Sequence, residues 1–275
     1  MFEKRTPMMA LEGVSKYFGS VAALANISLE VHAGEVLCLL GDNGAGKSTL
    51  IKILCGFHPA SSGTIKYEGE EVEFKSPRDA SDLGISTVHQ FGGTFPLMTL
   101  GRSFFVGVEP TKGWGPFTYF DKKKANDIVV EQMQSMGITR VTDGERLVGS
   151  LSGGERQVSA IARAVYFGAK VLILDEPTAA LGVKEAAHVL RIVMQAKNRG
   201  IAVVFITHNV RHAMTVGDHF VVLIRGVKAD DFAKGERTRA EITDLMAGGE
   251  AMAEVEAELA QLSGAGESTA PAIDS

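Results

Sequence analysis

Hydrophobic residues along the chain fall into two alternating kinds of segment. Some runs are almost entirely apolar over the length of a strand, as in strands buried on both faces of a sheet: 35–40, 171–174 and 202–206. Other segments place apolar residues at the spacing of a helix: 50–56, 121–137 and 151–168. This alternation predicts an α/β fold.

Shorter elements near the N-terminus follow a different pattern. Four short segments have the composition of strands: 9–14, 27–31, 63–67 and 72–74. The last two flank the turn signal Glu68-Gly69-Glu70, so we expect them to form a hairpin. Pro77 is expected to open a short helix, and 85–88 to form a further strand. The first four segments predict an antiparallel β subdomain beside the α/β core.

The composition is that of an ordinary globular protein. The 275 residues, 45% hydrophobic and 22% charged, suit one large domain, or one domain with an embedded subdomain. A net charge of −5 gives no electrostatic reason to expect a nucleic acid partner. The longest apolar stretches, such as 201–206, are far shorter than the roughly 18 residues that cross a bilayer, and no signal peptide is evident. With Cys38 and Cys55 expected as reduced thiols, these features predict a cytosolic protein.

One stretch fits the phosphate-loop pattern G-x-x-x-x-G-K-[ST] at every position: Gly41-Asp42-Asn43-Gly44-Ala45-Gly46-Lys47-Ser48-Thr49. A predicted strand precedes it and a predicted helix follows, which is the context this motif requires. The glycines let successive backbone N–H groups point at a phosphate near the positive end of the new helix. Lys47 is expected to neutralise charge on the β- and γ-phosphates, and the Ser48 hydroxyl to ligate Mg²⁺. The stretch therefore predicts a nucleotide site.

Carboxylates and an imidazole follow two of the buried strands. At the carboxyl end of one strand, Asp175 can bind Mg²⁺ through water, and Glu176 can take a proton from an attacking water. At the end of another, His208 can hydrogen-bond the γ-phosphate or orient that water, although an isolated histidine is more often structural. His212 lies four residues later, but the sequence offers neither the glutamate nor the third ligand of a zinc helix.

Three further features have both a functional and a structural explanation. Gln90, at a strand end before two glycines, could ligate Mg²⁺ or position water, or be only a solvated amide. Tyr17 and Phe18 lie at a turn, where one ring could stack on a base or belong to the core. The segment Leu151-Ser152-Gly153-Gly154-Glu155 opens a predicted helix, as a second anion site or as an ordinary serine N-cap.

These motifs occur in the order and at roughly the spacing found in ATP-binding cassette (ABC) ATPases, and the chain resembles that family over about residues 8–248. The resemblance implies an ATPase domain over 1–248 that binds ATP and Mg²⁺, with Phe18 or else Tyr17 stacked on the adenine and Gln90 at the metal. It also implies that Ser152, Gly153, Gly154 and Glu155 of one copy cap the ATP of another, in a head-to-tail homodimer. A helical subdomain at about 91–165 would receive a membrane permease.

Within the family, the chain looks most like ATP-binding subunits of bacterial monosaccharide importers of the ribose, xylose, fructose and inositol type. The residues that carry this likeness lie at 41–54, 56–59, 88–90 and 178–181, and the length suits a single cassette. The resemblance implies a peripheral ATPase at the cytoplasmic face of the cell membrane, working with permease subunits and indirectly with an extracytoplasmic sugar-binding protein. Two other functions share the motifs: a soluble cassette ATPase, as in iron–sulfur cluster assembly, and a transporter ATPase for a non-sugar solute.

Two positions depart from the pattern of the family. Gly182 replaces the aspartate that usually ends Ala-Leu-Asp, which removes a contact across the dimer. Glu155 replaces the more frequent glutamine, a change that we expect to be tolerated because Ser152 and the glycine amides make the main phosphate contacts. Beyond the ATPase domain, 249–262 is expected to be an acidic amphipathic helix and 263–275 a disordered tail.

Overall fold

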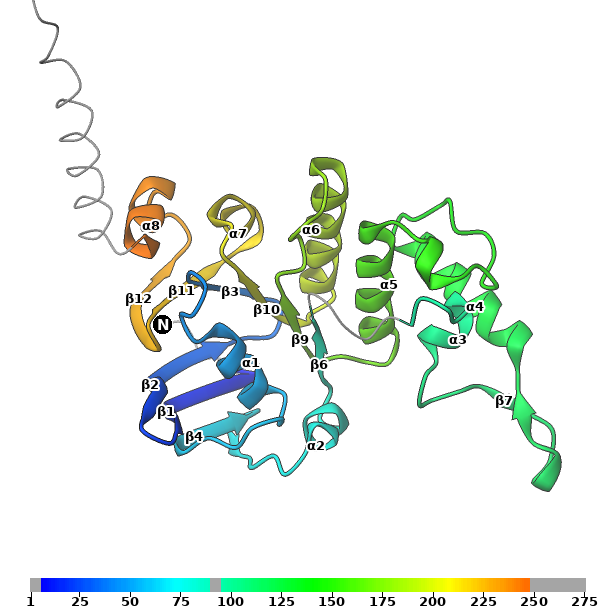
Figure 1. Cartoon of the computed structure of the whole chain (residues 1–275), viewed down its shortest axis with the longest axis horizontal. Coiled ribbons are helices and arrows are strands. Elements are labelled where there is room, and N and C mark those ends of the chain that lie inside the picture. The colour runs from blue at the N-terminus through cyan, green and yellow to red at the C-terminus, as the bar shows by residue number, and fades with distance from the viewer. Residues whose placement is uncertain (1–5, 90–94, 248–275) are drawn as a thin grey trace, which may run out of the picture.

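A computed structural model describes residues 6–89 and 95–247 of the chain. Its centre is a six-stranded sheet in the order β12-β11-β3-β10-β9-β6 (Figure 1). The strands are β3 (Val36–Leu40), β6 (Ile85–Val88), β9 (Val171–Asp175), β10 (Ala202–Thr207), β11 (His219–Ile224) and β12 (Val227–Ala233). Neighbouring strands are parallel except for β12, which pairs antiparallel with β11. The predicted α/β core is confirmed.

The central sheet is buried on both faces, which explains its continuously apolar strands. Every residue of β3 is buried, and successive side chains enter opposite layers. Val36, Cys38 and Leu40 pack with the helical layer, whereas Leu37 and Leu39 pack with the N-terminal sheet. Burial raises the pKa of the Cys38 thiol, so this cysteine behaves as a small apolar side chain.

The second sheet is antiparallel, with four strands in the order β2-β1-β4-β5. Its strands are β1 (Met9–Phe18), β2 (Val21–Val31), β4 (Ser62–Tyr67) and β5 (Glu70–Glu71). The predicted strand over 72–74 is wrong, because pairing ends at Glu71 and the chain then bends to bury Phe74. Phe74 packs against Gly56, where an added Cβ would lie 2.9 Å from the Phe74 Cβ.

Eight α-helices complete the described part of the chain: α1 (Lys47–Leu54), α2 (Pro77–Asp82), α3 (Leu100–Phe104), α4 (Lys122–Ser135), α5 (Gly153–Tyr166), α6 (Val183–Asn198), α7 (Val210–Val216) and α8 (Arg239–Met246). Side-chain oxygens cap several of these helices, including those of Asp121 at α4 and Thr238 at α8. Helices α6 and α7 cover one face of the central sheet, and α1 with the second sheet covers the other (Figure 1). None of the described helices is long and apolar enough to cross a membrane.

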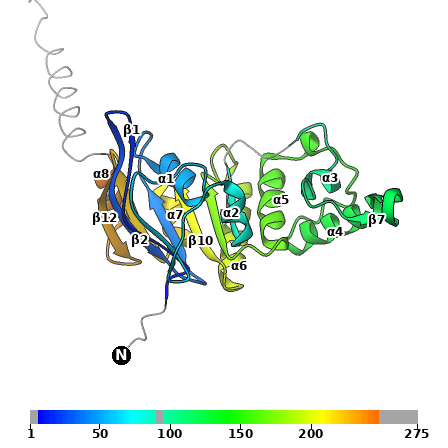
Figure 2. The same cartoon turned by 90° about the horizontal axis from the view of Figure 1, so that it is seen from below.

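Helices α3, α4 and α5 lie at the end of the molecule opposite β1, β2 and β12 (Figures 1 and 2). A short hairpin projects from them, formed by β7 (Thr111–Lys112) and β8 (Tyr119–Phe120). These elements fall within the expected helical subdomain at about 91–165. Gln90, the expected helix over 249–262 and the expected tail over 263–275 lie outside the described residues.

Candidate functional site

The phosphate loop connects β3 to α1, and its backbone shape requires glycine. Gly46 is the N-cap of α1 and has φ 105°, in the region that side chains disfavour. A Cβ at Gly46 would lie 2.8 Å from Leu24 Cδ2 and 3.0 Å from the Ala23 carbonyl oxygen. A Cβ at Gly41 would lie 2.6 Å from the Leu223 carbonyl oxygen. The second sheet and β11 thus fix the loop tightly.

Lys47, the first residue of α1, folds back into the loop. Its ammonium group donates hydrogen bonds to the carbonyl oxygens of Gly41, at 2.7 Å, and Asp42, at 3.0 Å. Burial lowers the pKa of Lys47, and the carboxylates of Glu176, Asp42 and Asp175 act in the opposite direction. A cation thus lies at the centre of the loop, beside the amides of a helix N-terminus, which is a favourable place for an anion.

A cavity of about 470 Å³ lies over the phosphate loop. Its lining consists of residues 42–49 of the loop, Val21–Ala23 of β2 and Arg225 of the turn between β11 and β12. The next residue, Gly226, donates its amide hydrogen to the Ala45 carbonyl oxygen at 2.9 Å, which ties this turn to the loop. Sequence reasoning missed Arg225, since only the pairing of distant segments brings it to the cavity. The Arg225-Gly226 turn between two strands was the available signal.

Three parallel strands end side by side at the loop. In the register of the sheet, Thr207 of β10 pairs with Leu40 of β3, and Ile206 pairs with Asp175 of β9. The phosphate loop, the Asp175-Glu176 pair and the Thr207-His208 pair therefore emerge at one edge, where ligands bind in such sheets. The sequence had placed Asp175, Glu176 and His208 at strand ends, and the structure brings these strand ends together beside the phosphate loop.

The Glu176 carboxylate is almost enclosed, with 11% of its side chain exposed, and it accepts three hydrogen bonds. Oε1 accepts from the amide of His208 at 2.9 Å and lies 2.7 Å from His208 Nδ1, while Oε2 accepts from Thr207 Oγ1 at 3.0 Å. Glu176 also has φ 48°, which is unusual for a residue with a side chain. The turn after β9 is thus shaped to hold this carboxylate against the end of β10.

Two other histidines lie near these carboxylates. His89, at the end of β6, places Nδ1 3.9 Å from Asp175 Oδ2, an approach that the sequence did not reveal. His212 places Nδ1 2.9 Å from the hydroxyl of buried Thr178, so it and His208 have different partners. Burial, with the charge of Arg211, lowers the pKa of His212. His212 helps to hold the segment that follows Glu176.

The two candidate rings for adenine stacking lie beside the cavity wall. Phe18 pairs with Val21 and Tyr17 with Ala22 across the turn between β1 and β2. Both rings are about half exposed, and the Phe18 ring meets that of His58 edge to face, with centroids 5.5 Å apart. The position suits either ring for the stacking expected from the sequence.

The segment Leu151–Glu155 starts α5 in the manner of a capping box. Ser152 Oγ accepts from the Glu155 amide at 3.2 Å, and Glu155 Oε2 accepts from the Ser152 amide at 2.8 Å. No residue of 151–155 is among the described residues that line the cavity over the phosphate loop. Ser152 therefore acts as an ordinary N-cap. Within one chain, the start of α5 does not form part of the cavity over the phosphate loop.

Together, the phosphate loop, its enclosed lysine and the carboxylates at the same sheet edge define a phosphate-loop nucleoside triphosphatase. The ABC transporter family model matches residues 24–179. The Xylose/arabinose import ATP-binding protein XylG of Sulfolobus acidocaldarius is 42% identical, over 87% of this chain and 93% of that protein. The Fructose import ATP-binding protein FrcA of Rhizobium meliloti is 37% identical, over 77% of this chain and 83% of that protein.

Solved structures agree with the sequence relatives. A nucleotide-free ATP-binding cassette from an ABC transporter matches with a TM-score of 0.71 and 25% identity, over 86% of this chain and 94% of that one. The chain belongs to the ABC transporter family and is an ATP-binding, ATP-hydrolysing member of it. The resemblance and fold predicted from the sequence are confirmed.

Proposed function

We propose that this chain is the ATP-hydrolysing subunit that energises import of a monosaccharide through a membrane ABC transporter. The observation that carries the proposal is the meeting of the phosphate loop, Glu176 and His208 at the ends of β3, β9 and β10. We propose a monosaccharide as the transported solute because both named relatives are sugar import ATP-binding proteins. Residues 1–248 form the ATPase domain in this proposal, with the helical subdomain inserted at about 91–165.

Binding of ATP is assigned to the loop at residues 41–49 and to Phe18 or Tyr17. The loop amides and Lys47 hold the β- and γ-phosphates, and one of the two rings stacks on the adenine. Mg²⁺ fits the oxygen donors present, the Ser48 hydroxyl and the Asp175 carboxylate with Gln90 proposed beside them, and when bound it supplies charge neutralisation on the phosphates. Positioning and charge neutralisation are what phosphoryl transfer chiefly requires.

Glu176 is assigned as the base that accepts a proton from the attacking water, with His208 as its partner. The three hydrogen bonds to the carboxylate fix its direction. Because His208 Nδ1 faces Glu176, the ring presents Nε2 as the nitrogen for a γ-phosphate oxygen. Both side chains are thereby positioned before the reaction begins.

The second copy of the chain is assigned to complete each site. Ser152, which is exposed, and the Gly153, Gly154 and Glu155 amides lie at the start of α5, apart from the phosphate loop of the same chain. Facing the phosphate loop of another copy, they would cap its ATP with amides at the positive end of a helix. A head-to-tail homodimer with two sites follows.

A groove of about 660 Å³ is the proposed seat of the permease. It lies between α2 and β6 on one side and α3 and α5 on the other, and apolar side chains line it, including Phe57, Phe95 and Phe167. Phe57 is 62% exposed. Arg163 supports one wall by donating to the carbonyl oxygens of Phe104, at 2.8 Å, and Val106, at 2.9 Å. An amphipathic helix of a permease at the cytoplasmic face suits such a groove.

A pull-down from detergent-solubilised membranes, joined to ATPase assays, tests the proposal. We expect a multi-span permease among the partners, and an ATPase rate that rises when one sugar-loaded binding protein is added. Phe57→Ser should weaken recovery of the permease, and Val227→Ser, an exposed position on β12, serves as the control. Recovery of soluble partners alone, with no response to any monosaccharide, would replace the transport function by the soluble alternative.

A further inference from the structure

The hairpin over residues 109–121, here called the arm, projects from the helical end of the molecule (Figures 1 and 2). Its tip is a tight turn in which the amide of Phe117 donates to the Trp114 carbonyl oxygen at 3.1 Å. Gly113 has φ 106°, and a Cβ there would lie 2.2 Å from the Phe117 carbonyl oxygen. The Asp121 amide closes the base by donating to the Pro110 carbonyl oxygen at 2.7 Å. The arm thus presents its tip in one defined shape.

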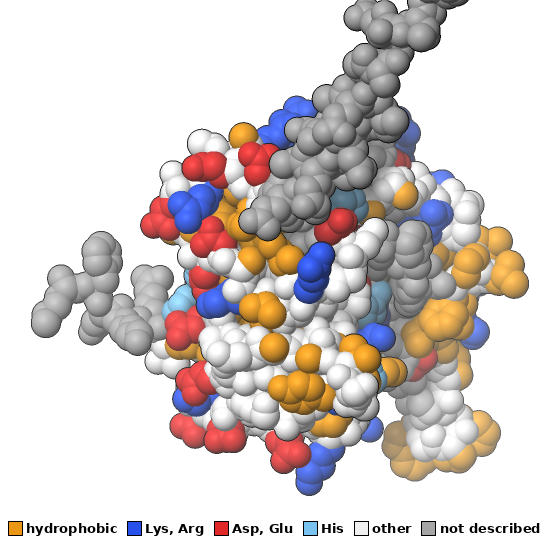
Figure 3. Space-filling view, turned by 60° about the vertical axis from the view of Figure 1, so that its left-hand side comes forward, with side chains coloured by type: hydrophobic (Ala, Val, Ile, Leu, Met, Phe, Trp, Pro, Cys, Tyr) orange, Lys and Arg blue, Asp and Glu red, His pale blue; other side chains and the backbone are white. Residues whose placement is uncertain are grey.

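The tip exposes three aromatic rings to solvent. Trp114 is 86% exposed, Phe117 79% and Tyr119 59%. In the space-filling view, hydrophobic side chains gather at the receding lower end of the molecule, where the arm projects (Figure 3). Two other phenylalanines of this end, Phe104 and Phe105, are only 1% and 3% exposed in the core. The rings at the tip, in contrast, lie outside the packing of the helices.

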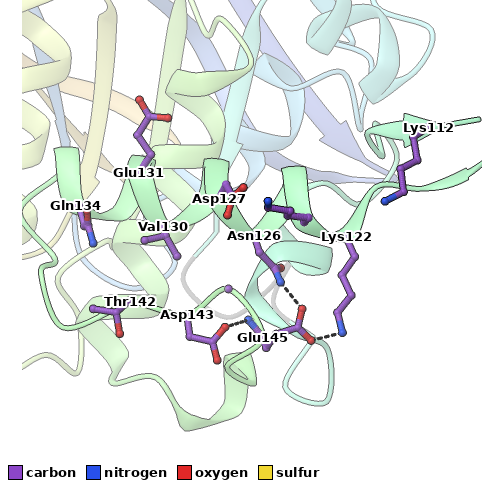
Figure 4. A pocket seen from close by; sticks show the side chains of 12 residues that line it. Lys112, Lys122, Asn126, Asp127, Val130, Glu131, Gln134, Thr142, Asp143 and Glu145 are labelled. Carbon is purple, nitrogen blue, oxygen red and sulfur yellow. Dashed lines mark hydrogen bonds and ion pairs between the residues drawn. The ribbon is translucent and has the colours of Figure 1, made fainter.

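Lysines flank these rings in the sequence. Residues 109–124 contain four lysines and two carboxylates, within a chain of net charge −5. Lys122 points to Glu145, which also accepts from Asn126, beside a polar pocket of about 790 Å³ (Figure 4). Lys112 lies 5.3 Å from the centroid of the Tyr119 ring and 3.6 Å from Asp121.

The remaining two lysines add charge at the base of the arm. Lys123 and Lys124 are exposed in the first turn of α4, and neither forms an ion pair within the described ranges 6–89 and 95–247. Cations at a helix N-terminus oppose the helix dipole, so their place there is not explained by stability of α4. A negatively charged partner would compensate them.

The arm continues directly from the proposed permease groove. Val106 and Val108 line the groove, and β7 begins three residues later at Thr111. In Figure 1 the arm points to the side of the molecule on which α2, which borders the groove, lies. A groove occupied by a membrane protein therefore places the tip of the arm on the side that faces the membrane.

We propose that the arm is a membrane-surface anchor that binds anionic phospholipids. Trp and Tyr favour the interface between water and hydrocarbon, where their rings are apolar and their polar atoms stay hydrated. Lys123, Lys124 and Lys112 meet the negative headgroups, each strengthening binding about fivefold near an anionic surface. The combination of exposed rings at the tip and cations behind them favours a lipid surface over a protein groove. The inference rests on the proposed function only for the direction in which the groove faces.

Trp114 is the only tryptophan of the chain, so its fluorescence reports on the arm directly. The isolated full-length protein is titrated with vesicles of phosphatidylglycerol and phosphatidylcholine, and separately with phosphatidylcholine alone. We expect a blue shift of the emission, quenching by brominated lipids and strong sensitivity to salt with the anionic vesicles only. Unchanged emission with anionic vesicles would overturn the proposal. A shift that requires the reconstituted permease would assign the arm to a protein contact instead.

Charge-reversal variants test whether vesicle binding depends on the lysines beside the arm or on surface charge in general. Lys123→Glu with Lys124→Glu should weaken vesicle binding on the order of thirtyfold or more, because two attractive charges are lost. Glutamate suits the first turn of α4, so the fold should be retained. Lys184→Glu with Lys234→Glu, at exposed sites on α6 and after β12, is the matched control and should leave binding nearly unchanged. Equal losses in both variants would contradict the assignment.

Phe117→Ser tests the apolar part and leaves the Trp114 probe in place. We expect a smaller blue shift and weaker binding to anionic vesicles, with the Lys47-dependent ATPase rate in solution retained. Binding equal to that of the unsubstituted protein would reduce the arm to an electrostatic contact and overturn the proposed insertion. Neither vesicle experiment requires ATP, a sugar or a permease, so failure here is distinct from failure of the proposed transport function.

Discussion

Thr207 Oγ1 donates a hydrogen bond to Glu176 Oε2 at 3.0 Å and accepts one from the Asn209 amide at 3.0 Å. The threonine is completely buried at the end of β10, so its hydroxyl has a fixed direction. Through this hydroxyl, the strand that precedes His208 also orients the carboxylate that follows β9. Thr207 is therefore a positioning residue for the proposed base.

Replacing Thr207 by valine should lower kcat about tenfold or more while ATP affinity stays close to that of the unsubstituted protein. The substitution keeps the volume but removes a hydrogen bond to a charged acceptor, which contributes about 1.5–3 kcal/mol. Thr207→Ser keeps the hydroxyl and should restore most of the rate. Steady-state ATPase kinetics of the two variants make the comparison, and equal rates for Val and Ser would show that the hydroxyl does not position Glu176.

Glu176→Gln should bind ATP normally and turn over roughly two orders of magnitude more slowly or worse, because an amide cannot accept the proton of the attacking water. The ATP-bound dimer should accumulate, as measured by light scattering after gel filtration with ATP. Rapid turnover by this variant would remove Glu176 from the role of base. Glu73→Gln, at an exposed position, is the control and should behave as the unsubstituted chain.

Lys47→Ala should lose both hydrolysis and most nucleotide affinity. The variant removes the cation whose ammonium group sits between the Gly41 and Asp42 carbonyl oxygens at the centre of the loop. Equilibrium binding of a fluorescent ATP analogue and ATPase assays measure the two effects. Affinity equal to that of the unsubstituted protein would contradict the assignment of the phosphate site.

Arg225→Ala should weaken ATP binding several-fold without a comparable loss of kcat. The arginine lines the cavity over the loop, so its cation contributes to attraction of a polyphosphate but lies apart from the carboxylate and imidazole. Arg191→Ala, on an exposed position of α6, provides a control of equal charge. Titrations at low and high salt should show the difference between the variants shrinking as salt rises.

The raised pKa of His219 predicts that this residue contributes to folding stability in a pH-dependent way. Hydrogen bonding to Glu35 and also to Asp231, whose other oxygen pairs with Lys228, raises the pKa of His219 above its ordinary value of 6.5. The protonated form is thus favoured in the folded state. The stabilisation is complete below the unfolded-state pKa and is lost as pH rises through the higher folded-state pKa.

The test compares His219→Gln with the unsubstituted chain. Urea unfolding at about pH 5.5 and about pH 9 should show a larger loss of unfolding free energy at the lower pH. His58→Gln is the control, because the His58 ring meets the rings of Phe18 and Phe57 edge to face. A loss independent of pH would show that charge on His219 does not stabilise the fold.

Local features of the sequence predicted much of the site. The phosphate loop, the cap of α5 and the strand before Asp175 depend on neighbouring residues, so their patterns were sufficient. The prediction of a strand over 72–74 was wrong. The chain bends there because Phe74 is buried against Gly56, a contact that no local sequence pattern indicates.

Contacts between distant segments account for what the sequence did not predict. Arg225 lies at the cavity because the Gly226 amide donates a hydrogen bond to the carbonyl oxygen of Ala45, a residue far away in the chain. The approach of His89 to Asp175 depends on the adjacency of β6 and β9. The roles of Phe18 and Ser152 remain predictions, since each depends on a molecule outside the chain.

The separation of Ser152 from the phosphate loop of its own chain has a genetic consequence. In the proposed head-to-tail pair, Lys47→Ala spoils the site that the chain holds, whereas Ser152→Ala spoils the site of its neighbour. A mixed pair of these two inactive chains brings an unaltered loop together with an unaltered helix start at one of its two sites. Co-expression of the Lys47→Ala and Ser152→Ala chains should therefore restore ATP hydrolysis, whereas neither variant alone should hydrolyse ATP.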